Sequence, residues 1–295
     1  LLRKVPPASV EWKIDFKYNL TSIPFYFFLD NKTNRPSFSS VNSFIHQHAI
    51  GYDIRLAVIT NVFVSYQCVL FRNNNLYYSS PICQSDHKFF PDKLVSIYAD
   101  VLSLCHSPMK NYARFTFDVF CFLLYIPQQI LENSTFITSQ MRDYIHESLG
   151  LLNIKSYHVL KPNEYVYALR SYSIEPHPCV EIFGQTLVAL RSFIKKVYNL
   201  DTQNPYIFAF FNRKQTRHIS NLKSIYYAAK KRYPGFFYMY DEPFYTTYLE
   251  NARLFNKILI LFTPHGALCV NLMFMQPKTV LIEIQADISG FNFFK

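Results

Sequence analysis

The chain has 295 residues, of which 50% are hydrophobic, and it carries a formal net charge of +10. A chain of this length forms one large domain or two ordinary ones, and its composition supplies a substantial core, which excludes an intrinsically disordered protein. The basic balance suits an anionic partner, such as a phosphate compound, a nucleic acid or a membrane surface. No segment reaches the roughly 18 uninterrupted apolar residues of a membrane-spanning helix.

The cysteines and glycosylation sequons do not decide in which cellular compartment the protein resides. The six cysteines contain no C-x-x-C pair, which argues against zinc-binding and thioredoxin-like sites, while their even number permits disulfides. N-x-S/T sequons occur at Asn19, Asn31 and Asn133, about as many as chance supplies in a chain this rich in Asn, Ser and Thr. These features are compatible with the secretory pathway and do not establish it.

The first 200 residues begin irregularly and then alternate between strands and helices. Residues 1–50 contain four prolines and few periodic runs, so we expect an irregular segment there. Residues 52–80 favour a β meander of two or three strands that turns at "RNNN". From Leu94 onwards, helix and strand patterns alternate. We expect helices over residues 112–132, 139–150 and 180–199, and strands over residues 156–160 and 164–169.

Four short apolar runs separated by helices make up the last third of the chain. We expect strands over residues 206–211, 236–240, 258–262 and 279–284, with helices over residues 220–232, 245–255 and 266–275. This pattern indicates a parallel sheet flanked by helices, in which a ligand binds beyond the carboxyl ends of the strands. The loops "NRKQTRHISN" and "TPHGA" both follow a strand at that edge.

Arg213 and Arg217 lie in the first of these loops, directly before the helix predicted to begin near Ser220 or Asn221. An arginine side chain binds phosphate oxygens through a planar fork of donors, and a helix N-terminus adds backbone N–H groups with a partial positive charge. Together they indicate a diphosphate site. The alternative is a pair of surface arginines neutralised by local carboxylates.

His265 follows a buried strand, and Gly266 lets the backbone approach a ligand closely. A histidine at this edge donates to a phosphate or hydroxyl, or acts as a base. Glu283 ends the next strand at the same edge, where a carboxylate accepts hydrogen bonds from ribose hydroxyls. Each residue also has a plain structural interpretation, as a hydrogen-bonding histidine or an ordinary strand-end carboxylate.

A metal site finds no support in the sequence. No D-x-D motif occurs, and no His and carboxylate cluster has the spacing of metal ligands. Positive charge from arginine would therefore take the place of Mg²⁺ or Mn²⁺. The G-x-S-x-G, Walker and G-x-G-x-x-G motifs are also absent.

The two loop blocks, in this order and spacing, resemble glycosyltransferase family 61, which includes plant xylan xylosyl- and arabinosyltransferases and animal protein O-linked N-acetylglucosaminyltransferases. The family's R-x-x-x-R-x-I-x-N block is matched by Arg213, Arg217, Ile219 and Asn221. Its strand-HGA-helix-N-F-strand-E block is matched by His265, Gly266, Ala267, Asn271, Phe274 and Glu283. A weaker likeness extends upstream to residue 55, and "NYARFTFDVFCFLLYIP" is similar to a family helix that carries an acidic residue, here Asp118.

The resemblance implies an α/β protein with a GT-B-like architecture, in which two Rossmann-like domains face each other across a cleft. It also implies transfer of xylose, arabinose or N-acetylglucosamine from a UDP-sugar to a glycan or protein hydroxyl, with inversion, no cofactor and no obligatory metal. Arg213, Arg217 and Asn221 would bind the donor with the "HGA" residues His265, Gly266 and Ala267, and Glu283 would hold the ribose. Asp118, from the other domain, is the candidate base, with His265 as a second catalytic residue.

The predicted domains are an irregular segment (1–50), an acceptor-side α/β domain (51–200) and a nucleotide-sugar-binding domain (201–295). We expect residence in the lumen of the Golgi or endoplasmic reticulum, a membrane anchor outside this chain and no nucleic-acid partner. Arg114 and Leu268 depart from the family pattern, and the chain stops soon after Glu283. Two alternatives stay open: a non-catalytic relative that binds nucleotide or glycan, and an unrelated basic α/β protein that binds nucleic acid.

Overall fold

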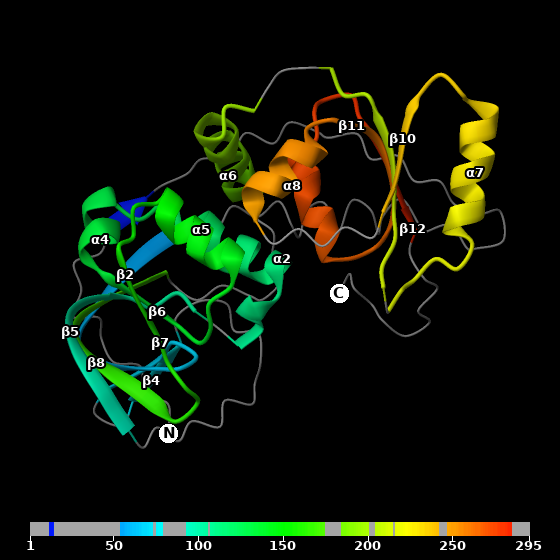
Figure 1. Cartoon of the computed structure of the whole chain (residues 1–295). Coiled ribbons are helices and arrows are strands. Elements are labelled where there is room, and N and C mark those ends of the chain that lie inside the picture. Colours follow the sequence, from blue (N-terminus) through cyan, green and yellow to red (C-terminus); the bar gives the residue numbers. More distant parts are fainter. Residues whose placement is uncertain are drawn as a thin grey trace, which may run out of the picture.

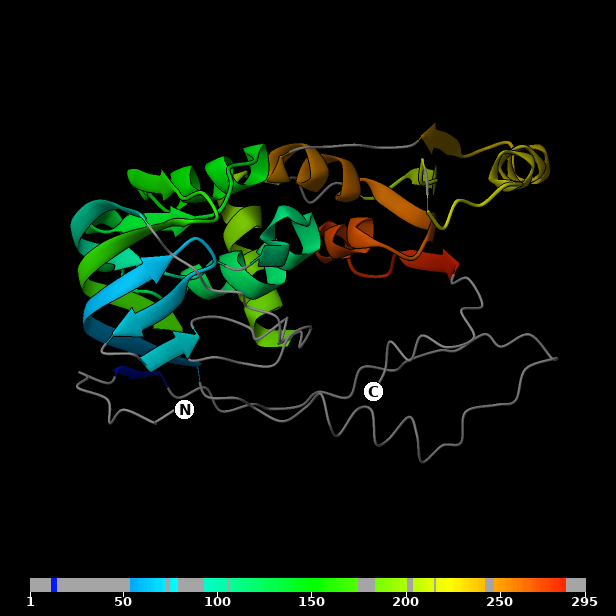
Figure 2. The same ribbon diagram turned by 90° about the horizontal axis from the view of Figure 1, so that it is seen from below.

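The computed structural model of the chain describes residues 12–14, 54–72, 75–78, 93–105, 107–174, 184–200, 204–214, 216–241 and 247–284. Two β-sheets lie at opposite ends of the molecule, and helices pack between them (Figures 1 and 2). The protein is therefore of the α/β class, as the alternation of strand and helix patterns predicts. The predicted irregular segment, residues 1–50, lies almost entirely outside the described residues.

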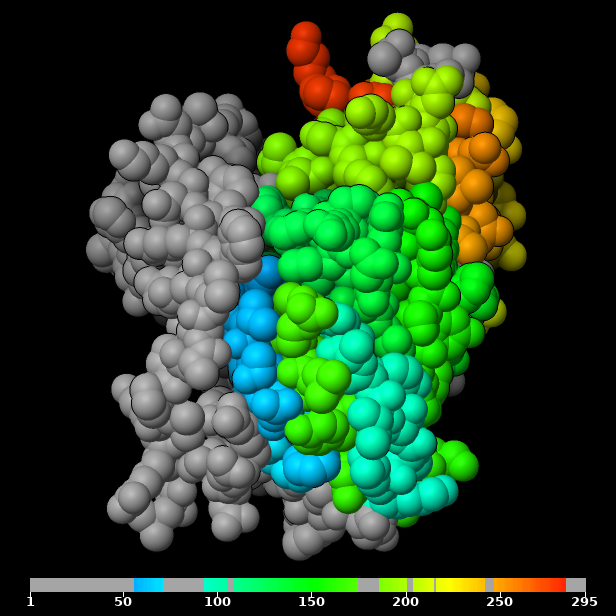
Figure 3. Space-filling model, turned by 90° about the vertical axis from the view of Figure 1, so that its left-hand side faces the viewer, coloured from blue at the N-terminus to red at the C-terminus, as the bar shows by residue number. Residues whose placement is uncertain are grey.

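The larger sheet is mixed and has the strand order β4-β3-β2-β8-β5-β6-β7, with β1 paired to β2. Its strands are β1 (Trp12–Ile14), β2 (Ile54–Ser65), β3 (Val69–Arg72), β4 (Asn75–Tyr78), β5 (Lys93–Leu102), β6 (Thr135–Thr138), β7 (Ser156–Val159) and β8 (Glu164–Ile174). The antiparallel run β2–β3–β4 confirms the predicted meander, whereas β8, β5, β6 and β7 pair in parallel. Figure 3 shows β2, β8 and β5 side by side on one face of the molecule.

The helices of this part are shorter than their sequence pattern predicts. They are η1 (Ser107–Lys110), α2 (Tyr112–Phe115), the π-helical turn η2 (Thr116–Phe120), α3 (Cys121–Leu123), α4 (Gln128–Asn133), α5 (Asp143–Leu151) and α6 (Gly184–Val197). The prediction of one helix over residues 112–132 is wrong, because the helix ends after Leu123 and α4 begins only after Pro127. The amides of Tyr125 and Ile126 bond to carbonyls three residues back, which tightens the last turn. Pro127 has no amide hydrogen and caps α4 instead of continuing the first helix.

The smaller sheet has four strands, all parallel, in the order β10-β9-β11-β12. They are β9 (Ile207–Phe211), β10 (Phe237–Asp241), β11 (Ile258–Pro264) and β12 (Val280–Ile284), connected by α7 (Leu222–Arg232), α8 (Tyr248–Phe255) and the 3₁₀ helix η3 (Ala267–Phe274). All four predicted strands are confirmed. One face of β9 packs on α8, where the rings of Phe211 and Phe255 lie 6.0 Å apart, and the other packs on α7, where Phe210 meets Tyr226 at 5.6 Å.

Polar contacts join the helices of the two sheets. The Tyr112 hydroxyl of α2 donates to Oδ1 of Asn271 in η3 at 2.8 Å. The Glu147 carboxylate of α5 accepts hydrogen bonds from the backbone amides of Tyr248 and Leu249, which begin α8. A carboxylate at a helix N-terminus accepts hydrogen bonds from the free backbone amides of the first turn. Its negative charge also interacts favourably with the positive end of the helix dipole. In the part of the chain that the structure describes, no helix is both long and apolar enough to cross a membrane.

Candidate functional site

The carboxyl edge of the smaller sheet collects most of the predicted site residues. Strands β9 and β11 are neighbours, and β12 lies beside β11, with Thr263 paired to Glu283. The loop that follows β9 and the turn that follows β11 therefore leave the sheet side by side. Beyond the carboxyl ends of parallel strands, loops and helix N-termini converge, so this edge is the expected ligand site of an open α/β sheet.

Asn212 shapes the loop after β9. Its side chain is 5% exposed, its Oδ1 accepts from the amides of Arg213 (2.9 Å) and Ile219 (3.0 Å), and its Nδ2 donates to the Ile219 carbonyl (2.9 Å). This side chain thus closes the loop from both ends and holds Arg213 in place. Asn212 is not among the predicted site residues, although its position directly after a buried apolar strand is a usable signal, because such a polar side chain must find partners.

Arg213 is anchored to the turn that carries His265. Its Nη1 donates to the His265 carbonyl at 3.0 Å, and its Nη2 donates to Oγ1 of Thr216 at 3.4 Å. Gly266 makes this approach possible, since a Cβ at that position would lie 2.3 Å from Nη1 of Arg213. Partial burial lowers the pKa of Arg213 below its ordinary value, and repulsion from Arg217 lowers it further.

Arg217 completes a pair of cations at this edge. It is half-buried and adopts the left-handed backbone conformation with φ of 58°, which is uncommon for a residue other than glycine. In the described part of the chain, no carboxylate forms an ion pair with Arg213 or Arg217. Neighbouring guanidinium groups without a counter-ion favour the binding of an anion. The alternative, in which local carboxylates neutralise the two arginines, therefore finds no ion pair to support it among the described residues.

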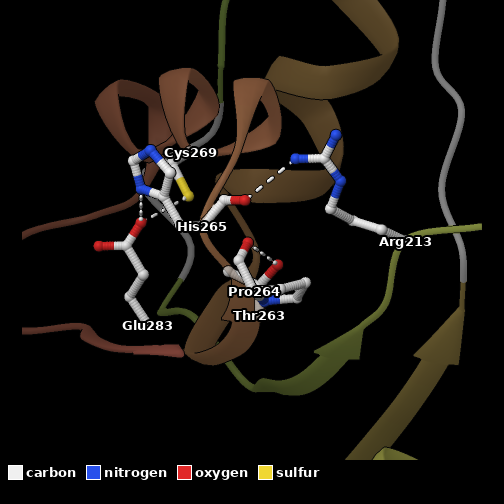
Figure 4. A network of polar contacts seen from close by, with 6 residues as sticks. All are labelled: Arg213, Thr263, Pro264, His265, Cys269 and Glu283. Carbon is white, nitrogen blue, oxygen red and sulfur yellow. Dashed lines mark hydrogen bonds and ion pairs between the residues drawn. The ribbon is translucent and has the colours of Figure 1, made fainter. Parts of the chain in front are cut away.

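His265 and Glu283 form the second polar group at this edge. Nδ1 of His265 lies 2.7 Å from Oε1 of Glu283, and the Cys269 thiol donates to the same oxygen at 3.4 Å. Figure 4 shows the imidazole of His265 and the guanidinium of Arg213 on opposite sides of the His265 main chain, with Nε2 directed away from Glu283. Burial and the adjacent Glu283 raise the pKa of Cys269 to about 12, so this thiol is a donor and not a nucleophile.

The remaining "HGA" and helix residues lie around this group. Ala267 is the first residue of η3 and is half-buried, and Leu268 packs against the core. Asn221 occupies the N-cap position of α7, is exposed, and makes no side-chain capping bond to the described helix. Asn271 is 1% exposed and accepts from Tyr112, so it joins η3 to α2. Asn221 is thus exposed at the start of α7, whereas Asn271 is buried in the contact between η3 and α2.

Asp118 is not part of this group of contacts. It lies in the π-helical turn η2, is 1% exposed, and has Nη1 of Arg114 at 3.8 Å from its Oδ2. Burial raises the pKa of Asp118 to about 7, and the positive charge of Arg114 opposes this rise. Arg114, noted in the sequence as a departure from the family pattern, is therefore the ion-pair partner of the predicted base. A carboxyl group with a pKa near neutrality has a suitable proton affinity for general base chemistry.

Comparison with known proteins identifies the family. A family model described as Glycosyltransferase 61 matches residues 112–282, which is more than half of the chain. The chain belongs to glycosyltransferase family 61. The matched region begins at α2 and contains Asp118, both arginines and the "HGA" residues, while Glu283 lies one residue beyond it. A search of curated proteins finds no match. Strands β2 to β5 precede the matched region.

Membership of family 61 makes the protein a glycosyltransferase, which takes a sugar from a donor and passes it to an acceptor glycan. The stretch of residues 111–127 that resembles a family helix falls, except for its first residue, within the match, and the resembling stretch of residues 58–79 falls outside it. Among the described residues, no group of three or more His, Cys, Asp or Glu side chains is arranged to hold a metal ion.

Proposed function

We propose that the protein moves a sugar from a UDP-sugar to a hydroxyl group of a glycan or glycoprotein, with inversion at the anomeric carbon and without an obligatory metal. The observation that carries this proposal is the pair Arg213 and Arg217 at the carboxyl edge of a parallel sheet, where the described residues supply no carboxylate to neutralise them. Two neighbouring cations, of which Arg213 is anchored by the His265 carbonyl, offer the charge that a leaving nucleoside diphosphate needs.

In the proposed reaction, the acceptor oxygen bonds to the anomeric carbon while the bond from that carbon to the donor phosphate oxygen breaks. The electron pair of the breaking bond leaves with the nucleoside diphosphate. Arg213 and Arg217 stabilise the charge that builds on its phosphates. The anchoring of Arg213 by the His265 carbonyl keeps this cation in place before the reaction begins, so little reorganisation is required.

A base must take the proton of the acceptor hydroxyl, and two residues are candidates. His265 has a ring that is 41% exposed and is held at Nδ1 by Glu283, so an acceptor or a donor phosphate can reach this ring from solvent. Asp118 has a suitable pKa of about 7 but is 1% exposed. The burial of Asp118 favours His265 as the base. Glu283, whose side chain is 24% exposed and whose Oε1 bonds His265, is the proposed partner of a ribose hydroxyl.

The proposal includes a GT-B-like arrangement of two Rossmann-like halves, with boundaries near residues 51–200 and 201–295. The four parallel strands of the smaller sheet and the parallel strands β8-β5-β6-β7 of the larger sheet support it. The antiparallel meander β2–β3–β4 is an addition to the simple Rossmann pattern. The donor would bind to the half that carries Arg213, and the acceptor would approach from the half that carries Asp118.

We also propose residence in the lumen of the secretory pathway, with a membrane anchor in the full-length protein. A disulfide between Cys68 and Cys105 supports an oxidising compartment, because such bonds are rare in the cytosol. The sequon residue Asn133 is exposed at the end of α4, which is compatible with glycosylation.

A thermal-shift titration with UDP tests the donor site. Since a ligand that binds only the folded state raises the melting temperature, we expect a dose-dependent rise that persists in EDTA and is lost in Arg217→Ala. Lys231→Ala is the matched control, because it removes an exposed cation at the other end of α7. No rise with UDP or any other nucleotide would overturn the donor assignment.

A second function, binding without turnover, is favoured by the burial of Asp118 against Arg114. A UDP-dependent rise without hydrolysis or transfer from any of a set of UDP-sugars, in the presence of glycan acceptors, would support this non-catalytic function. Sugar transfer abolished by His265→Ala would support catalysis.

A further inference from the structure

The positive charge of the chain is concentrated around α7. Between residues 202 and 240 the sequence has no Asp or Glu. It has seven basic residues there, which are Arg213, Lys214, Arg217, Lys223, Lys230, Lys231 and Arg232. The first three precede α7 and belong to the carboxyl edge of the smaller sheet, called the donor edge below, whereas the other four lie on the helix itself. The helix cations therefore need an explanation other than donor binding.

The outer face of α7 carries a row of three lysines and one tyrosine. Lys223, Tyr227, Lys230 and Lys231 have the i, i+4, i+7, i+8 spacing that places side chains on one face of a helix. All four residues are exposed. The helix rises about 12 Å from the first of them to the last. This row is called the α7 stripe below.

The inner face of α7 packs on the smaller sheet and holds the stripe in place. The ring centroid of Tyr226 lies 5.6 Å from that of Phe210 and 6.0 Å from that of Tyr238. Nζ of Lys230 lies 6.0 Å from the Tyr226 centroid, and the ring of Tyr227 contacts Tyr226 edge to face at 5.2 Å. The stripe is therefore displayed on a fixed helix, so binding to it orders few additional groups.

Helix stability does not account for the charge pattern of the stripe. Cations near a helix C-terminus interact favourably with the helix dipole, which accounts for Lys230 and Lys231. Lys223 lies in the first turn, where a cation is unfavourable and where α7 has no acidic residue. A solvated helix face gains stability from acidic and basic residues four apart, but α7 contains no acidic residue at all. A surface of one sign favours a partner of the opposite charge.

We propose that the α7 stripe docks an acidic glycan, which is a chain of sugars that carry carboxylate groups. The three lysines pair with carboxylates along the chain. Tyr227, which is 57% exposed between them, packs its flat ring on the apolar C–H face of a sugar. This inference goes beyond the proposed function and rests on it in one respect, because it takes a glycan as the polymer that the enzyme meets.

The α7 stripe is a docking surface apart from the site of sugar transfer. In Figures 1 and 2, α7 lies on the side of the smaller sheet that is away from the larger sheet. In the proposed function, the acceptor hydroxyl approaches from the half that carries Asp118, and the donor phosphates meet Arg213 and Arg217. A glycan on the stripe blocks neither path. It holds the enzyme on a glycan-bearing molecule while the transfer site stays open.

The shape of the stripe favours a glycan over an acidic peptide or a nucleic acid. Peptides bind mainly by adding a strand to a sheet edge or by filling an apolar groove, and the convex face of a helix offers neither. Single-stranded nucleic acids stack successive bases on several aromatic rings. The stripe has one ring, that of Tyr227, about 6 Å along the helix axis from Lys223 and from Lys231. A sugar ring with charged neighbours matches this order of groups.

Titration of the full chain with polygalacturonate tests the proposal. We expect this polymer of carboxylated sugars to bind at least about tenfold more tightly than its methyl-esterified form, which has the same backbone without the charges. Replacing Lys223, Lys230 and Lys231 together with Gln raises the Kd for polygalacturonate roughly tenfold, since three exposed ion pairs are lost. Tyr227→Gln raises the Kd severalfold at unchanged charge.

Matched variants on the larger-sheet half are the controls. Lys110, Lys155 and Lys161 are exposed there, and replacing all three with Gln leaves the Kd nearly unchanged. Tyr157→Gln removes a ring that is 45% exposed on β7 and also leaves the Kd unchanged. Equal weakening by the two lysine sets would show a general attraction to a basic protein and would overturn the proposal. Binding of polyglutamate or single-stranded RNA as tight as that of polygalacturonate would overturn it too.

The UDP-dependent rise in melting temperature is measured on the same variants. We expect the stripe variants to retain this rise, which shows that the smaller sheet is folded and the donor edge intact. Absence of the rise from the parent chain would refute the donor assignment, whereas polygalacturonate binding that is independent of the stripe would refute only the docking surface. Failure of the proposed function and failure of this inference are thus distinguished.

Discussion

Nδ1 of His265 lies 2.7 Å from Oε1 of Glu283, which links the turn after β11 to the end of β12. The two strands pair in parallel with Thr263 opposite Glu283, so the register of the sheet brings the two side chains together. A carboxylate at Nδ1 fixes the orientation of the imidazole ring. This relationship gives Glu283 a second interpretation, as a positioning residue for His265, beside its predicted role in ribose binding.

The Glu283→Gln variant separates these two roles of Glu283. If the carboxylate orients His265, we expect kcat to fall about 10- to 100-fold while KM for the donor changes little. Steady-state kinetics with varied donor concentration measures both constants. A large rise in donor KM at unchanged kcat would instead support the ribose role.

Gly266→Ala tests the close packing of the arginine anchor. The added Cβ would lie 2.3 Å from Nη1 of Arg213, so we expect the guanidinium to move away from the His265 carbonyl. The end of an arginine side chain moves at little cost, so the free energy of unfolding should fall by less than about 1 kcal/mol. The dissociation constant for UDP should rise about tenfold, since one charge-assisted contact is worth roughly 1.5 kcal/mol.

Gly235→Ala is the matched control for this substitution. A Cβ at Gly235 would have no atom within 4 Å, and the residue lies at the other end of α7 from the donor edge. We expect UDP affinity to be unchanged in this variant. Equal loss of affinity in both glycine variants would contradict the specific contact between Gly266 and Arg213.

The buried Asp118 makes stability depend on pH. Burial raises the pKa of its carboxyl group from the ordinary value near 4 to about 7, so the folded state holds this proton more tightly than the unfolded state does. Stability therefore decreases as the pH rises from about 4 to about 7, with the full cost present above that range.

Asp118→Asn removes the charge and keeps the shape. At pH 8 we expect the variant to be more stable than the parent, by up to roughly 4 kcal/mol if the pKa shift is fully expressed, and the gain should vanish near pH 4. Urea denaturation at several pH values measures it. A gain that is the same at pH 4 and pH 8 would contradict the burial of an ionisable group. Transfer activity of the variant then decides whether Asp118 is also the base.

The disulfide between Cys68 and Cys105 closes a segment with a sequence separation of 37 and ties the β2–β3 turn to the loop after β5. In the chain-entropy model, a cross-link over this separation lowers the entropy of the unfolded chain and so raises the free energy of unfolding by about 4 kcal/mol. We expect the double variant Cys68→Ala, Cys105→Ala to unfold at correspondingly lower urea concentration. Peptide mapping without reductant should recover the cross-linked pair. Alkylation of both thiols in the unfolded, unreduced protein would contradict the bond.

Several features of the fold could be predicted because their pattern is local. The four strands of the smaller sheet are continuous apolar runs between helices, and such runs are typical of buried parallel strands. The edge that carries Arg213, His265 and Glu283 followed from the order of strands and loops alone. The sequence pattern does not predict strand β5, because Lys93 and Asp100 interrupt its apolar run. In the fold, these two residues pair with Glu164 and Arg170 on the neighbouring strand β8. The helix break at Pro127 has a local signal in the sequence, because a proline cannot continue a helix.

The sequence by itself determined the family, the parallel sheet and the edge at which the candidate donor residues lie, because periodicity and motif spacing depend on neighbours along the chain. Only the tertiary structure decided that Glu283 holds His265, that Gly266 makes room for Arg213, and that Asp118 is buried beside Arg114. The first two contacts join separate strands and loops, so they depend on sheet register and packing. The burial of Asp118 likewise depends on what packs around η2, which spacing along the chain does not encode.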